Sequence, residues 1–157
     1  RTGKTFVFEA GLKTPLLIHW PGISNAGVRS GELVTSMDFY PTLLEMAGFP
    51  TKPKQHLDGL SIVPLFKGDA LKRDALYWHF PHYQGEGSYP ASAIRVGDYK
   101  LIHNYHQDDL LLYDLKNDPG ETKNLAQSMP EKAKQLNRKL MAYLKKTGAY
   151  IPQPIEN

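Results

Sequence analysis

Cysteine is absent from this chain of 157 residues. Without thiols the chain forms no disulfide bonds and offers no thiolate ligands to a metal ion. Long apolar runs are missing as well: none approaches the roughly 20 residues that span a bilayer, so we expect no transmembrane helix and no membrane partner. The sequence also starts at Arg1, with neither a methionine nor a signal peptide, and we expect it to be a piece of a longer polypeptide.

Charge of one sign is not concentrated in any part of the chain. The net charge is +3, and lysine and arginine are scattered along the sequence. Nucleic-acid binding usually requires a basic stripe with a groove-reading motif or stacking aromatics, and neither is evident. The sequence therefore predicts no nucleic-acid partner. With 41% hydrophobic and 22% charged residues, the composition is that of a globular protein.

The first half of the chain has the patterns of an α/β fold. The apolar run Leu16-Leu17-Ile18 lies between Pro15 and the turn Trp20-Pro21-Gly22, which is typical of a strand buried on both faces. A largely buried helix is predicted from Phe39 to about Ala47, with Asp38 as its N-cap and Gly48 after its last turn.

The second half has a different pattern, that of an antiparallel sheet covered by a helix. Four runs rich in β-branched and aromatic residues predict strands near residues 76–80, 92–96, 99–105 and 110–115. Gly97-Asp98 predicts a hairpin turn between the second and third of them. Residues 130–146 form an amphipathic helical pattern that Gly148 closes. We place the boundary between the two halves near residue 70.

Lys4 is the first candidate for chemistry. It follows Gly3, a residue that lets the backbone approach a ligand closely, and its ammonium suits an oxyanion such as sulfate or phosphate. A surface lysine in a turn is the alternative interpretation. The six histidines include two pairs spaced three apart, His79 with His82 and His103 with His106. On a strand this spacing puts the members of a pair on opposite faces, which argues against a metal site.

Seven segments, in this order, resemble the carboxy-terminal part of a type I sulfatase of the alkaline-phosphatase-like superfamily. The segments are Gly3-Lys4 with Phe8-Glu9-Ala10-Gly11, Pro15 to Gly22, Asp38 to Leu44, Asp58-Gly59, Arg95 with Gly97 to Ile102, Leu112 to Leu115, and Asp118 to Glu121. The resemblance implies a fold in two parts: residues 1–70 complete the large catalytic α/β domain, and residues 71–157 form a small α+β subdomain with an antiparallel sheet and a C-terminal helix.

The resemblance also implies an activity, the hydrolysis of sulfate esters. The nucleophile of this family is a formylglycine made from the Cys or Ser of a C/S-x-P-x-R motif, beside a calcium ion. Lys4 matches the family lysine that contacts the sulfate oxygens and is the catalytic residue that the resemblance assigns. His82 and His79 lie in a Trp-His-x-Pro-His-Tyr-like segment and are candidate contacts for a sulfated small molecule or glycan.

The sequence departs from the family pattern where the nucleophile is concerned. The chain has no cysteine, and the nearest serine version, Ser88-Tyr89-Pro90-Ala91-Ser92, lacks the arginine. We therefore expect the nucleophile and the calcium ligands outside this chain, in the remainder of a sulfatase polypeptide, and we expect the isolated chain to be inactive. Within the chain the resemblance implies no metal ligand, and it implies a periplasmic, lysosomal or extracellular location.

Two other functions stay open at the level of the sequence. A phosphonate or phosphate ester hydrolase of the same superfamily would share the α/β core and differ in nucleophile and metals. A non-catalytic carbohydrate-binding or interaction module would use the aromatic residues between Tyr77 and Tyr89 as its platform.

Overall fold

The computed structural model describes residues 6–85 and 87–152. These residues divide into two compact units, one of residues 15–73 and the other of residues 6–14 together with 74–152. The first described residues therefore group with the sheet. The prediction that residues 1–70 complete a catalytic domain concerns a longer protein and stays a prediction.

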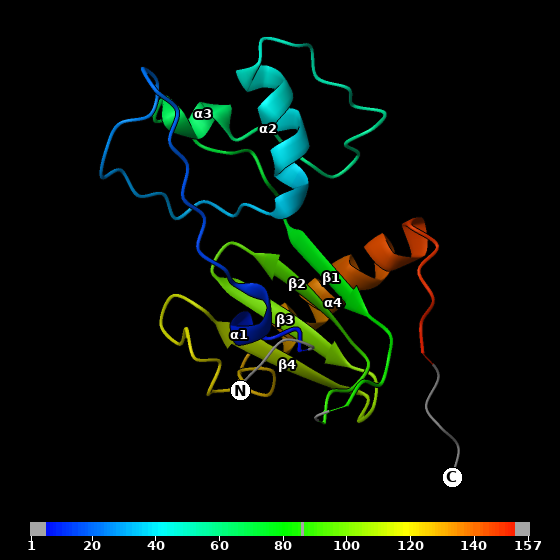
Figure 1. The fold of residues 1–157 in the computed structure, drawn as a ribbon. Coiled ribbons are helices and arrows are strands. Elements are labelled where there is room, and N and C mark those ends of the chain that lie inside the picture. Colours follow the sequence, from blue (N-terminus) through cyan, green and yellow to red (C-terminus); the bar gives the residue numbers. More distant parts are fainter. Residues whose placement is uncertain (1–5, 86, 153–157) are drawn as a thin grey trace. The chain divides into compact units, whose positions relative to one another are not determined.

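The larger unit is built on a four-stranded antiparallel sheet with strand order β1-β2-β3-β4 (Figure 1). Its strands are β1 (Leu76–Phe80), β2 (Ala91–Val96), β3 (Tyr99–Asn104) and β4 (Asp109–Asp114). The predicted strands and the predicted hairpin are thereby confirmed. The hairpin turn uses Gly97 at a φ of 55°, a left-handed conformation that glycine adopts without steric cost.

One face of this sheet is covered by α4 (Pro130–Lys146), as the amphipathic pattern predicts. The apolar stripe of α4 packs against inward side chains of β2, β3 and β4; the buried residues of this cluster are Ala133, Leu136, Leu140, Leu144, Ile94, Leu101 and Leu112. Tyr143 stacks on Tyr77 of β1 with ring centroids 3.8 Å apart. Gly148, at a φ of 67°, follows the helix and ends it.

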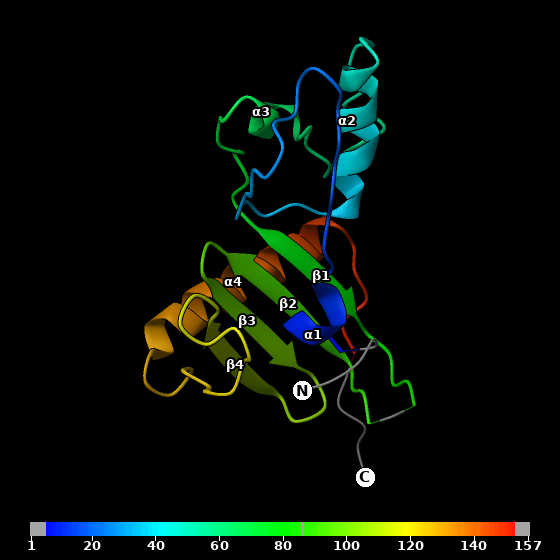
Figure 2. The same cartoon turned by 60° about the vertical axis from the view of Figure 1, so that its left-hand side comes forward.

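The opposite face of the sheet is covered by the segment that opens the described chain. Val7 and Phe8 are buried there against Ala91, Ile102 and Tyr113, and the short helix α1 (Glu9–Leu12) follows them. Figure 2 shows α1 and α4 on opposite sides of the same sheet. The sequence predicted only the α4 layer, because four helical residues give no periodic signal.

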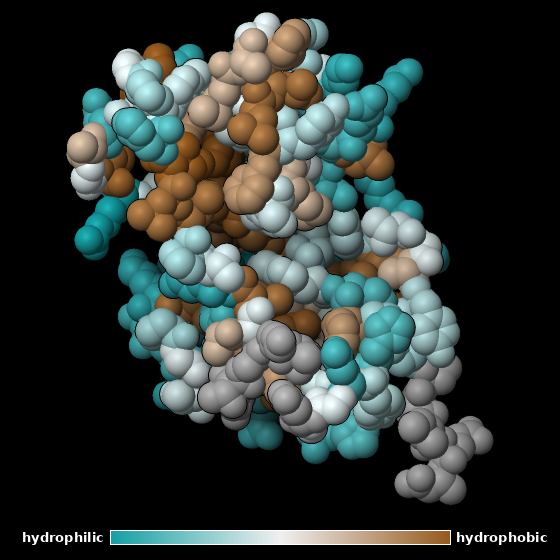
Figure 3. All heavy atoms as spheres, in the orientation of Figure 1, coloured by the Kyte–Doolittle hydropathy of each residue, from teal (hydrophilic) through white to brown (hydrophobic). Residues whose placement is uncertain are grey.

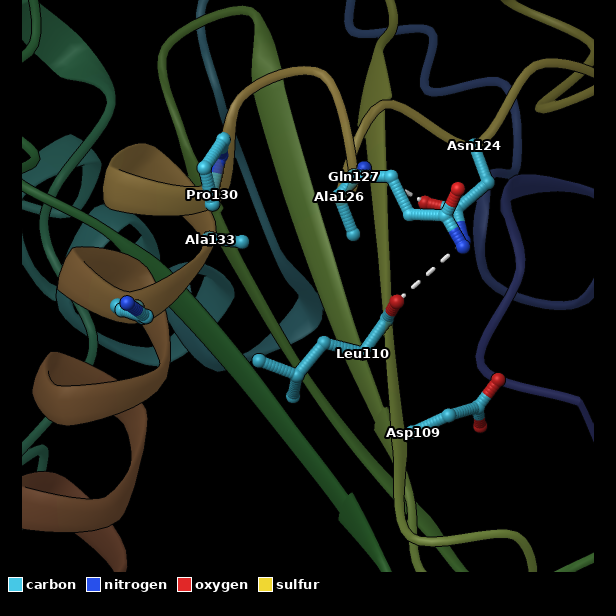
Figure 4. A pocket seen from close by; sticks show the side chains of 8 residues that line it. Asp109, Leu110, Asn124, Ala126, Gln127, Pro130 and Ala133 are labelled. Carbon is cyan, nitrogen blue, oxygen red and sulfur yellow. Dashed lines mark hydrogen bonds between the residues drawn. The ribbon is translucent and has the colours of Figure 1, made fainter.

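The outer edge of β4 is covered by the loop that precedes α4. Leu112 donates its N–H to Asn124 Oδ1 at 2.9 Å. Figure 4 shows the second bond, in which Asn124 Nδ2 donates to the Leu110 carbonyl oxygen at 3.3 Å. A hollow of about 330 Å³ lies beside these residues, between β4 and the start of α4. The side chain of Asn124 thus takes the place of a fifth strand and satisfies edge groups that would otherwise invite pairing.

The smaller unit is organised around the buried carboxylate of Asp38. It contains a short 3₁₀ turn (Ser36–Asp38), α2 (Phe39–Met46) and α3 (Val63–Phe66). Asp38 accepts hydrogen bonds from the N–H groups of Thr35 and Leu60, both at 2.8 Å, and forms an ion pair with Arg73. Asp38 is the N-cap residue of α2, as predicted, but its side chain makes no capping hydrogen bond to that helix and closes the preceding turn instead.

Two further expectations for this unit are corrected. Leu16, Leu17 and Ile18 are not a buried strand but an exposed irregular segment, with Leu17 88% exposed. A strand buried on both faces needs neighbours to pair with, and residues 15–73 contain no strand. Helix α2 is present but is not largely buried, since only Pro41 and Thr42 are buried and Leu43 is 62% exposed.

The exposed apolar side chains of this unit gather on its surface. Figure 3 shows apolar residues clustered over the part of the chain that carries α2 and α3. The large exposed apolar residues of this unit are Leu16, Leu17, Ile18, Ile23, Val28, Met37, Phe39, Tyr40, Leu43, Phe49, Leu57 and Leu60. Across the described residues, every helix is too short or too polar to cross a bilayer.

The α4 layer gives a direct test of the core. Leu140 is fully buried between α4 and the sheet, so Leu140→Ala should lower the free energy of unfolding by about 3 kcal/mol. Leu43→Ala removes the same atoms from an exposed site and should change it by less than about 0.5 kcal/mol. Urea unfolding followed by circular dichroism measures both, and equal losses would contradict the assignment of the core.

Candidate functional site

Lys4, the predicted catalytic residue, lies outside the described residues. The described chain begins two positions later at Phe6, whose ring meets Tyr89 edge to face with centroids 6.3 Å apart. Residues 6–12 then run across the face of the sheet opposite α4. The contacts that hold residues 6–12 on the sheet are the described contacts nearest to Lys4 in the sequence.

The segment is held by a network of four charged side chains. Lys100 Nζ lies 3.0 Å from Glu9 Oε1 and 3.0 Å from Glu121 Oε1. Arg95 Nη1 lies 3.2 Å from the other carboxylate oxygen, Glu9 Oε2. The N–H of Glu9 itself donates to Glu121 Oε2 at 2.7 Å. We call Glu9, Arg95, Lys100 and Glu121 the ion network.

The two cations are brought together by strand register. Arg95 of β2 and Lys100 of β3 are paired across the hairpin, so their side chains project from the same face of the sheet. Side chains alternate along a strand, and this face is the one that α1 covers. The hairpin turn at Gly97 thereby places two positive charges under the carboxylate of Glu9.

Glu121 reaches the network from a strained turn. It follows Asp118-Pro119-Gly120 with a φ of 53°, a left-handed conformation that is uncommon outside glycine. Its N–H donates to the Asp118 carbonyl oxygen at 3.1 Å, and its side chain is buried. Glycine would adopt this backbone conformation with less strain. A glutamate is explained by its carboxylate, which contacts Lys100 and accepts from the Glu9 amide.

The network is balanced in charge, and two of its members, Lys100 and Glu121, are buried. The side chain of Lys100 is 0% exposed, and its Nζ also lies 5.8 Å from the centroid of the Trp78 ring. Removing one partner of a buried ion pair leaves an uncompensated charge in a medium of low polarity, which is strongly destabilising. The four groups therefore depend on one another, and Lys100 is closed to a separate anion.

Arg95 pairs with an acid that is distant in the sequence. Its partner is Glu9, which lies 86 positions away. The periodicity of strands and helices carries no information on such a pairing. The sequence feature that could have indicated a buried ion pair is Lys100, a charged residue between the apolar strand residues Tyr99 and Leu101.

His79 lies on the other face of the sheet. Its Nε2 lies 2.8 Å from the carbonyl oxygen of Tyr150, and because a carbonyl only accepts, the ring hydrogen is on Nε2. Nδ1 then accepts from Ser92 Oγ, at 2.6 Å, and Ser92 in turn accepts from the Tyr105 hydroxyl. Burial raises the pKa of Tyr105, and the hydrogen bond to Ser92 opposes that shift. Both ring nitrogens of His79 are thus engaged within the protein.

His82 has different surroundings. It is exposed in the loop that follows β1, and its ring meets Phe80 edge to face with centroids 5.6 Å apart. The adjacent Tyr83 lies with its hydroxyl 3.0 Å from His106 Nδ1, a pairing that the sequence did not predict. Substrate contacts of His82 and His79 stay predictions, and of the two His82 is the one whose ring is open to a ligand.

The remaining histidines do not converge on a metal site. His103 Nδ1 lies 3.1 Å from Asn137 Oδ1 of α4, whereas His106 faces Tyr83. Within residues 6–85 and 87–152, no three side chains of His, Cys, Asp or Glu are placed to hold a metal ion. The described residues therefore do not fit a calcium ion, and we derive no step through one.

Solved structures of longer proteins superimpose on this chain; one of a 2-O GAG sulfatase does so with a TM-score of 0.57 at 26% identity, over 69% of this chain and 24% of that one. A protein solved in complex with its substrate D-glucosamine-2-N,6-O-disulfate superimposes with a TM-score of 0.78 at 31% identity, over 91% of this chain and 30% of that one. The fold is thus that of the carboxy-terminal part of a sulfatase, as the sequence predicts.

Sequence comparison identifies the family to which the chain belongs. The family model for the C-terminal region of N-sulphoglucosamine sulphohydrolase matches residues 2–149, and the chain belongs to this family. A sulfatase of Formosa agariphila is 38% identical over 95% of this chain, and an N-acetylglucosamine-6-O-sulfatase of Bacteroides thetaiotaomicron is 33% identical over 92% of it. The chain spans only 30% and 26% of the lengths of these two relatives.

The burial of the ion network predicts a large effect of its central cation. Lys100→Met keeps the length of the side chain but leaves two carboxylates without their shared partner, and should cost about 3–5 kcal/mol of stability. Lys134→Met removes a lysine whose pair with Glu131 is exposed, and should cost less than about 1 kcal/mol. Urea unfolding compares the two variants. A small loss for Lys100→Met would show that the network contributes little.

Proposed function

We propose that this chain is the carboxy-terminal part of a longer sulfatase that hydrolyses sulfate esters of a sulfated carbohydrate. The match to the family over residues 2–149 carries the proposal. It is supported by relatives named as sulfatases and by a structural neighbour solved with a sulfated glucosamine. In the reaction, water replaces the alcohol at sulfur: the S–O bond to the sugar oxygen breaks, the alcohol takes a proton, and sulfate is released.

The part of this chain in the reaction is to hold the sulfate group. Lys4, by its resemblance to the family lysine, donates hydrogen bonds to sulfate oxygens and stabilises negative charge that develops on the transferring group. Positioned cationic donors of this kind commonly supply a large share of rate enhancement, since they need no reorganisation during the reaction. Glu9, one member of the ion network, lies on the same segment, five residues further along the chain.

The nucleophile and the metal belong to the remainder of the protein in this proposal. The family resemblance implies formylglycine and calcium, and the chain contains neither a cysteine nor a complete C/S-x-P-x-R motif. The isolated chain should then release no sulfate from an aryl sulfate, and turnover by pure material would contradict the proposal. The proposal includes a periplasmic, lysosomal or extracellular location for the enzyme, on the same resemblance.

Lys4→Ala in the complete enzyme tests the role of the lysine. Loss of one oxyanion donor should raise the barrier by ~3 kcal/mol, which is about a hundredfold fall in kcat. Lys146→Ala, an exposed lysine of the last turn of α4, is the matched control and should leave kcat unchanged. An unchanged kcat for Lys4→Ala would remove this lysine from the catalytic machinery.

His82→Ala tests whether the exposed loop contacts the sugar. Loss of one hydrogen bond of about 1 kcal/mol should lower kcat/KM on a sulfated saccharide about fivefold, mainly through KM. The same variant should act normally on a small aryl sulfate, which has no sugar for the loop to contact. Equal losses on both substrates, or no loss on either, would argue against a substrate contact at His82.

A further inference from the structure

We propose that Tyr83 and His106 form, together with His82, a surface at one end of the sheet that contacts the sugar ring of the substrate. The inference deepens the proposed function and rests on it, because the ligand is the sulfated saccharide that is proposed there. It adds Tyr83 and His106 to the contact proposed for His82, and the sequence indicated neither of them.

The register of the sheet brings two loops to the same edge. The last residue of β1, Phe80, and the last residue of β3, Asn104, lie in one row of the sheet, on either side of Ala91 of β2. Strands β1 and β3 both run antiparallel to β2, so both end at this edge. The loops that follow them carry exposed imidazoles, His82 after β1 and His106 after β3.

The two histidine pairs divide in the same way between sheet and loop. His79 and His103 lie in the sheet, and both nitrogens of each ring are engaged with protein groups. His82 and His106 follow three residues later, beyond the strand ends. With the residues that the structure describes, His82 makes no hydrogen bond through either nitrogen, and His106 makes none through Nε2. The loop histidines therefore keep nitrogens available to a ligand.

The two loops are joined by direct contacts. The Tyr83 hydroxyl lies 3.0 Å from His106 Nδ1, and the two rings meet edge to face with centroids 5.7 Å apart. The Tyr105 N–H also donates to the Pro90 carbonyl oxygen at 3.0 Å, which ties the turn after β3 to the end of the loop after β1. His82 precedes Tyr83 in the chain, so all three rings belong to this end of the sheet.

The turn that carries His106 is held by a buried side chain. Asn104 Oδ1 accepts from the N–H groups of His106 and Gln107, at 3.0 and 3.4 Å, and Asn104 Nδ2 donates to Gln107 Oε1 at 3.2 Å. Asn104 itself is buried at the end of β3. The backbone of His106 is thus set by the scaffold, and loops on rigid scaffolds commonly carry binding residues.

The chemistry of this surface suits a sugar ring. A saccharide presents hydroxyl groups that donate and accept hydrogen bonds, and C–H groups that form apolar faces. A neutral imidazole has one donor and one acceptor nitrogen. Tyr83 is 53% exposed and offers both an apolar ring face and a hydroxyl group. Small-molecule sites combine aromatic side chains with a few polar groups in this way, so a saccharide fits the surface.

The test uses the complete enzyme and two kinds of substrate. One kind is a set of sulfated monosaccharides that includes D-glucosamine-2-N,6-O-disulfate, and the other is a small aryl sulfate, which has no sugar ring. The quantity compared is the ratio of kcat/KM on a saccharide to kcat/KM on the aryl sulfate. A residue that serves only the fold affects both substrates equally and leaves this ratio unchanged.

The variants are Tyr83→Ala, Tyr83→Phe and His106→Ala, with Tyr150→Ala as the matched control. Tyr150 is a tyrosine that is 69% exposed after α4. The changes at Tyr83 and His106 remove atoms from exposed side chains, and His106→Ala keeps the backbone bond to Asn104. Substitutions at such sites usually leave the free energy of unfolding nearly unchanged, so all four variants should fold.

We expect His106→Ala to lower the ratio about fivefold through loss of one hydrogen bond, and Tyr83→Ala to lower it at least as much. Tyr83→Phe removes only the hydroxyl and should lower the ratio when His106 is present. In the His106→Ala background it should change the ratio less than about twofold, because residues that act through one another are not additive. Tyr150→Ala should leave the ratio unchanged.

The outcomes separate this inference from the proposed function. If the complete enzyme releases sulfate from a saccharide and the ratio is unchanged in both Tyr83→Ala and His106→Ala, the sugar contact is wrong and the function stands. If the complete enzyme releases sulfate from none of the saccharides, the proposed function fails, and the inference fails with it.

Discussion

Buried charge is the constraint on which this structure depends. Lys100 lies without solvent contact between the carboxylates of Glu9 and Glu121, and Arg95 balances the remaining charge. Lys100 and Glu121 cannot be buried at low cost unless their partners are present. Segments that are 91 and 112 residues apart in the sequence therefore come together in one arrangement, which holds Glu9 and the start of α1 on the sheet.

The network also explains why separate sequence motifs occur together. Three of the segments on which the family resemblance rests contribute to it: the first brings Glu9, the fifth Arg95 and Lys100, and the last Glu121. Their common feature is a shared set of contacts on one face of the sheet. The strand pattern predicted β2 and β3, and the register of the hairpin then made Arg95 and Lys100 neighbours. The partner of both cations could not be predicted, because pairing over long separations leaves no local pattern.

The strand predicted at Leu16-Leu17-Ile18 did not form, whereas the failed prediction for α2 concerns what covers the helix rather than what the element is. Helices α2 and α4 were both predicted from their spacing of apolar residues, and both are present. Only α4 has a sheet to cover its apolar face, whereas Leu43 of α2 remains exposed in its own unit. For the candidate site, the sequence indicated Lys4 and His82 by resemblance. It did not indicate that both ring nitrogens of His79 are occupied on the opposite face.

Amide hydrogen exchange at residues 9–12 tests the central claim most directly. The N–H groups of Glu9, Gly11 and Leu12 are hydrogen-bonded to Glu121 and to the Phe8 carbonyl oxygen. If the ion network holds this segment, the three amides should exchange slowly in the unchanged protein. In Lys100→Met they should exchange much faster relative to the sheet amides of β3. Equal protection in both proteins would show that apolar contacts alone fix the segment, and would contradict the account.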